Sequence, residues 1–231
     1  MVGVGAYLAL GSAIIGGIFA ALVFRQYAAK RKIFQLVWGI GLALFTLASL
    51  FEFISELQGW TVPLYRAYFS LHPTLVAVLG LGTVYLLADK RYGHAFLIYI
   101  VAMLGVLLAF TWTVPVDESA FVPGRVVGGA AMPPRDESLV RNLSPLFTIP
   151  GAAALIGGAL YSWYRTRWSY NLLIAAGAAI MTAGGTLAAL RTAEFLYVFL
   201  LVGISIMFVG FLRSLEVARA PRPEPAPTTA P

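Results

Sequence analysis

The chain has 231 residues, of which 60% are hydrophobic and only 11% are charged. A soluble domain carries about 25% charged residues because its surface needs them for solvation, so we expect much of this apolar surface to face lipid. The sequence contains no cysteine, which excludes disulfides, thiolate metal sites and a cysteine nucleophile.

Seven apolar runs are each about 20 residues or longer, the length that an α-helix needs to cross the hydrocarbon core of a bilayer. Their predicted boundaries are 3–24, 34–57, 65–88, 94–113, 144–164, 170–190 and 194–213. The first run has no basic residues before it, so it is predicted to be a retained helix and not a signal peptide. We therefore predict an all-α polytopic membrane bundle over residues 1–216, with a long extracytoplasmic loop at 114–143.

Basic residues alternate between the two sides of these seven runs. One side carries Arg25, Lys30, Arg31, Lys32, Lys90, Arg91, Arg165, Arg167, Arg213, Arg219 and Arg222. The other side carries Arg66, Arg125, Arg135, Arg141 and Arg191. Because the basic-rich side stays in the cytoplasm, we predict an outside N-terminus and a cytoplasmic C-terminus, with a disordered tail at 217–231. The net charge of +6 is explained by these turns, which argues against nucleic-acid binding.

The second run contains a polar stripe in its C-terminal half. The stripe consists of Thr46, Ser49, Glu52 and Glu56. Spacings of three and four residues place them on one helix face, opposite the apolar residues Leu47 and Ile54. Ionisable groups within a membrane span are costly, so this face is expected to point into the bundle and to be functional.

Further polar residues are predicted at the same outer level of the bundle. Arg66, Tyr68 and His72 begin the third run, and Arg191 follows the sixth. We expect a polar, outward-opening, ligand-binding cavity lined by Glu52, Glu56, Arg66, Tyr68, His72 and Arg191. The alternative is a partly solvated cluster of ion pairs at the helix ends. His72 and His94 fall near opposite ends of neighbouring runs, which argues against one haem iron held by both, and the sequence specifies no cofactor.

Small residues indicate where helices approach each other closely. Gly80 and Gly82 lie within the third run, and alanines recur every four residues at 175, 179 and 183 in the sixth. Both patterns predict helix packing. The loop at 114–143 carries charges of both signs, so a solvated loop is expected, with a lid over the outer cavity as the alternative.

Three functions are consistent with these patterns. The first is a small receptor- or sensor-like protein or accessory subunit of a prokaryotic plasma membrane, which binds a ligand or a membrane protein partner. It is favoured because the sequence contains no catalytic motif. The second is a transporter or channel that uses the carboxylates of the second run. The third is an intramembrane enzyme acting on lipids through Glu52, Glu56 and His72.

Overall fold

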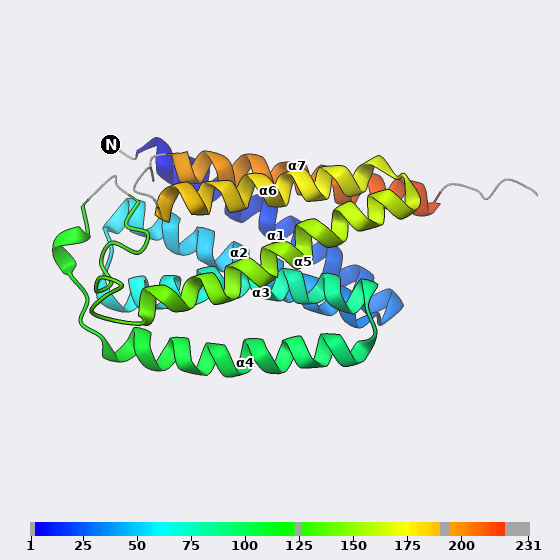
Figure 1. Cartoon of the computed structure of the whole chain (residues 1–231). Coiled ribbons are helices and arrows are strands. Elements are labelled where there is room, and N and C mark those ends of the chain that lie inside the picture. Colours follow the sequence, from blue (N-terminus) through cyan, green and yellow to red (C-terminus); the bar gives the residue numbers. More distant parts are fainter. Residues whose placement is uncertain (1–2, 123–125, 190–194, 220–231) are drawn as a thin grey trace, which may run out of the picture.

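A computed structural model describes residues 3–122, 126–189 and 195–219, and within these ranges the protein is all-α. The long helices are α1 (Val4–Lys30), α2 (Ile33–Gln58), α3 (Val62–Leu87), α4 (Lys90–Thr113), α5 (Val140–Thr166), α6 (Ser169–Ala189) and α7 (Leu196–Arg219) (Figure 1). A short 3-10 helix, η1 (Glu118–Ala120), lies between α4 and α5.

All seven long helices are long and apolar enough to cross a membrane, which confirms the predicted polytopic α-helical bundle. Several helices extend beyond the apolar runs: α1 continues to Lys30, α5 begins at Val140 and α7 continues to Arg219. The apolar run marks the residues that suit hydrocarbon, whereas backbone hydrogen bonding can continue into the headgroup region. The predicted tail at 217–231 thus begins within α7, and its part from residue 220 onward is outside the described residues.

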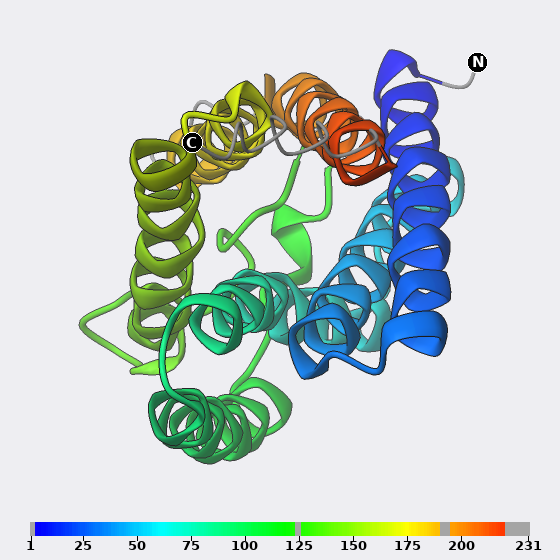
Figure 2. The same cartoon turned by 90° about the vertical axis from the view of Figure 1, so that its right-hand side faces the viewer.

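Six of the long helices form a closed ring, and the remaining one, α4, lies outside it. Following the contacts around the ring gives the order α1, α2, α3, α5, α6 and α7, and α7 returns to α1. Helix α4 packs against the outside of α3 and touches α5 (Figure 2). It buries a smaller share of its residues than any other helix, so most of its surface is left for lipid or for a partner.

The links between helices define two different ends of the bundle. The links 31–32, 88–89 and 167–168 are short turns at one end, which we term the turn end. The links 59–61 and 114–139 lie at the opposite end, which we term the loop end (Figure 1). The charge pattern predicts that the loop end is outside and the turn end cytoplasmic.

Glycines allow two pairs of helices to approach closely. A methyl group added at Gly151 of α5 would lie 2.6 Å from the backbone oxygen of Val76 in α3, and Gly80 meets Gly151 from the other side. Gly177 of α6 and Gly203 of α7 make a similar contact. The packing role predicted for Gly80 is therefore confirmed.

The alanine stripe predicted to pack in α6 was wrong in part. Ala175 is buried, but Ala179 and Ala183 are exposed. The side of α6 that meets α7 is instead the one that carries Gly177 and Gly184. Spacing alone identified a face rich in small residues, whereas close backbone approach depends on the glycines.

The described residues of the link between α4 and α5 pack onto the loop end of the ring. Val127, Ala131 and Met132 are buried, and the hydroxyl of Tyr65 donates a 2.9 Å hydrogen bond to the backbone oxygen of Gly128. In the view from the turn end, this segment is seen across the far end of the ring (Figure 2). The expectation of a fully solvated loop was wrong for residues 126–132, because their apolar side chains help to close the loop end.

Candidate functional site

The polar face of α2 points into the bundle, as its spacing predicts. Ser49 is buried and Glu52 is only 2% exposed, whereas Leu47 and Ile54 on the opposite face are 39% and 36% exposed. Glu52 lies two turns before the C-terminal end of α2, in the loop-end half of the helix. Its carboxyl group is therefore buried between the helices, in the half of the bundle nearer the loop end.

Glu52 has a neutral partner on the neighbouring helix. The hydroxyl of Tyr68 on α3 donates a 2.8 Å hydrogen bond to Oε1 of Glu52. Oε2 of Glu52 and the hydroxyl of Ser49 are buried and have no hydrogen-bond partner among the described residues. The ring of Trp60 packs against Tyr68 with 5.1 Å between ring centroids. The pair is thus covered in this conformation, and the predicted outward opening is not seen at Glu52.

His72 lies beside Tyr68, one turn further along α3. Its imidazole lies 5.5 Å from the ring of Tyr68 between centroids. A methyl group added at Gly185 would lie 3.9 Å from Cε1 of His72, so the imidazole faces α6. Glu52, Tyr68 and His72 therefore come together inside the ring, and we term these three residues the inner polar group.

Glu56 belongs to a second contact nearer the loop end. Oε1 of Glu56 accepts a 3.1 Å hydrogen bond from the hydroxyl of Tyr197, in the first turn of α7. Gly5 of α1 lies beside them, because a methyl group added there would come within 3.1 Å of Cδ of Glu56. Tyr197 was not predicted from the sequence. The available signal was a hydroxyl group at the outer end of an otherwise apolar run.

Arg66 does not join the carboxylates. Its guanidinium donates hydrogen bonds of 2.8 Å to the backbone oxygen of Trp112 and 2.9 Å to that of Val114, at the end of α4. Successive helix residues are turned by about 100°, so Arg66 points away from the face that Tyr68 presents to α2. Arg191 lies outside the described residues.

No ion pair involving Glu52 or Glu56 is found within the described residues. The salt bridge found there joins Arg91 to Asp89 at 3.3 Å, at the turn end. Among the described residues, no cation pairs with either carboxyl group, and Arg191, another predicted partner, lies outside them. Both carboxyl groups are held by tyrosine hydroxyls instead.

No protein-family model matches the chain. Comparisons with curated proteins and with solved structures also gave no match. Among the described residues, no group of three or more His, Asp or Glu side chains is placed to hold a metal ion. The inner polar group itself is therefore the feature that indicates function.

The chemistry of this group follows from the unpaired oxygen of Glu52. A carboxyl group buried in an apolar region is costly unless a proton, a cation or a hydrogen-bond donor meets it. Tyr68 supplies one donor to Oε1, which leaves Oε2 as an acceptor. The arrangement is suited to bind a small group that donates hydrogen bonds or carries positive charge.

Proposed function

We propose that this chain is a small receptor- or sensor-like protein, or an accessory subunit, of a prokaryotic plasma membrane. It binds a small ligand inside the loop-end half of the ring, and its N-terminus lies outside. The observation that carries the proposal is Glu52, which is 2% exposed and keeps one carboxyl oxygen without a partner among the described residues. Such a costly group in a membrane span is a functional site by default.

The surroundings of Glu52 favour a ligand with an amine or another strong donor. Oε2 of Glu52 is an acceptor, and the hydroxyl of Ser49 can donate or accept. The rings of Trp60 and Tyr68 lie close together near the carboxyl group, and aromatic faces attract cations. Access for the ligand requires the segment 126–132 or Trp60 to move, because both cover the loop end.

Native mass spectrometry of the protein released directly from its own membranes tests this proposal. We expect the wild-type protein to carry a small adduct that Glu52→Gln loses. The matched control Glu56→Gln, in which the carboxyl group bonded to Tyr197 is replaced, should keep the adduct. A wild-type protein that carries lipid alone, or an adduct that all three proteins retain equally, would contradict ligand binding at Glu52.

A transporter is the second candidate, because a buried carboxyl group without a cation can carry a proton or a cation. Against it, the buried cluster toward the turn end contains apolar side chains such as Leu79, Met207 and Phe211, which offer no partner to a moving charge. Proteoliposomes containing a pH-sensitive dye separate the two functions. Proton flux that wild-type protein supports and Glu52→Gln abolishes would establish transport in place of the receptor.

A further inference from the structure

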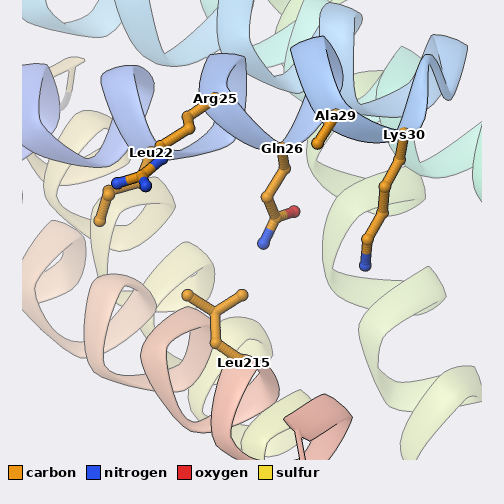
Figure 3. Close-up of a pocket in the computed structure, with 6 residues that line it drawn as sticks. All are labelled: Leu22, Arg25, Gln26, Ala29, Lys30 and Leu215. Carbon is orange, nitrogen blue, oxygen red and sulfur yellow. The ribbon is translucent and has the colours of Figure 1, made fainter.

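A groove lies between α1 and α7 at the turn end, opposite the end that holds Glu52. Its volume is about 210 Å³. It is lined by Leu22, Arg25, Gln26, Ala29, Lys30 and Leu215 (Figure 3). This groove is separate from the inner polar group, so an inference about it does not depend on the proposed function.

The polar groups that line the groove are hydrogen-bond donors. Arg25 and Lys30 are exposed cations, and neither forms an ion pair within the part of the chain that the structure describes. The side-chain oxygen of Gln26 accepts a 3.1 Å hydrogen bond from Nε2 of the buried Gln35. The amide nitrogen of Gln26 is therefore left facing the groove, on the side of Leu215 (Figure 3). With no carboxylate among its lining residues, the groove matches an anion.

The position of the groove along α1 places it at the surface of the bilayer. This helix has 27 residues, which corresponds to a length of about 40 Å. The hydrocarbon core is about 30 Å thick, so the final turns from Arg25 to Lys30 reach the headgroup region. Leu22 precedes Arg25 by about one helical turn and Lys30 by about two, and Leu215 lies opposite on α7. Both leucines offer apolar surface beside the donors.

We propose that this groove binds an anionic phospholipid. Its phosphate is held by Arg25, Gln26 and Lys30, and the start of an acyl chain lies along Leu22 and Leu215. Basic pockets between transmembrane helices bind anionic headgroups because two or more cations meet one phosphate at the membrane surface. A free anion would use the same donors, but it would gain nothing from the two leucines.

Native mass spectrometry of the full chain in detergent, titrated with phosphatidylglycerol or phosphatidylcholine, tests this proposal. Each cation near the membrane surface contributes about fivefold to affinity, so Arg25→Gln with Lys30→Gln should weaken phosphatidylglycerol binding roughly 25-fold. The matched control is Lys90→Gln with Arg165→Gln, which removes the same charge from the same end outside the groove. The affinity of this control for phosphatidylglycerol should stay within about twofold of wild type, because the cations that meet the phosphate are retained.

A variant that preserves charge provides an independent test. Leu215→Trp fills the apolar side of the groove and should also weaken phosphatidylglycerol binding, with the melting temperature measured to verify folding. Equal losses in the two double variants would mean that the whole basic surface attracts the lipid, which would overturn the proposal. Equal binding of phosphatidylcholine, or full displacement of phosphatidylglycerol by millimolar inorganic phosphate, would overturn it as well.

Discussion

Tyr68 on α3 donates a 2.8 Å hydrogen bond to Oε1 of Glu52 on α2, and both side chains are buried in the core of the ring. The bond joins two neighbouring helices through a neutral donor and a carboxyl group, without a cation among the described residues. In a membrane interior, such a bond is retained because the alternative for each partner is an unpaired polar group in an apolar region. The pair therefore contributes to stability and lies at the centre of the proposed ligand site.

Removing the hydroxyl of Tyr68 should destabilise the protein more than removing that of Tyr197. Tyr68→Phe leaves a fully buried carboxyl group without its donor, and we expect the free energy of unfolding to fall by about 1–3 kcal/mol. Tyr197→Phe removes the hydrogen-bond donor of Glu56, which is only half-buried and can reach water. The loss in free energy of unfolding should therefore stay below about 1 kcal/mol. Reversible unfolding in mixed micelles measures both values. Equal losses for the two variants would contradict the assigned burial of Glu52.

Gly151 and Gly157 of α5 should respond to alanine in opposite ways. A methyl group at Gly151 would lie 2.6 Å from the backbone oxygen of Val76, and a backbone atom cannot move aside cheaply. Gly151→Ala should therefore lower the melting temperature clearly. At Gly157 an added methyl group meets nothing within 4 Å, so Gly157→Ala should stabilise the helix by roughly 0.5–1 kcal/mol. A stable Gly151→Ala variant would show that α3 and α5 do not pack in this way.

The local part of the fold could be predicted from the sequence because membrane helices satisfy their backbone hydrogen bonds internally. Each apolar run thus becomes one helix, and the spacing from Ser49 to Glu52 places both on the buried face of α2. Glu52, Tyr68 and His72 were assigned to one site because they are expected at one depth in adjacent helices. The structure brings these three together.

The order of the helices around the ring could not be predicted. The runs differ in mean hydropathy, but α7 is nearly as apolar as α4, so hydropathy does not say that α4 lies outside while α7 closes onto α1. The contact between Glu56 and Tyr197, 141 positions apart, follows from that closure. Arg66 was predicted to lie near the carboxylates because of its depth alone. Its side chain instead leaves α3 on another face and donates hydrogen bonds to carbonyl groups at the end of α4.

The hydroxyl of Tyr65 should hold the segment 126–132 against the loop end. Tyr65 is fully buried, and its hydrogen bond to Gly128 joins α3 to this segment. Tyr65→Phe should therefore increase hydrogen–deuterium exchange in 126–132, because its backbone loses a partner inside the bundle. Tyr99→Phe is the matched control, since Tyr99 donates a similar bond to Leu146 on the surface. Unchanged exchange in Tyr65→Phe would mean that apolar packing alone holds the segment.

The orientation predicted from the charge pattern can be measured directly, because the chain has no cysteine to interfere with labelling. Glu118→Cys places a thiol on η1 at the loop end, and Lys32→Cys places one in the turn between α1 and α2; both positions are exposed. In intact cells a membrane-impermeant maleimide should label Glu118→Cys, because basic turns stay in the cytoplasm. Lys32→Cys should react only after permeabilisation, and the unsubstituted protein serves as the blank. Labelling of Lys32→Cys in intact cells would reverse the orientation, placing the groove between α1 and α7 at the outer surface.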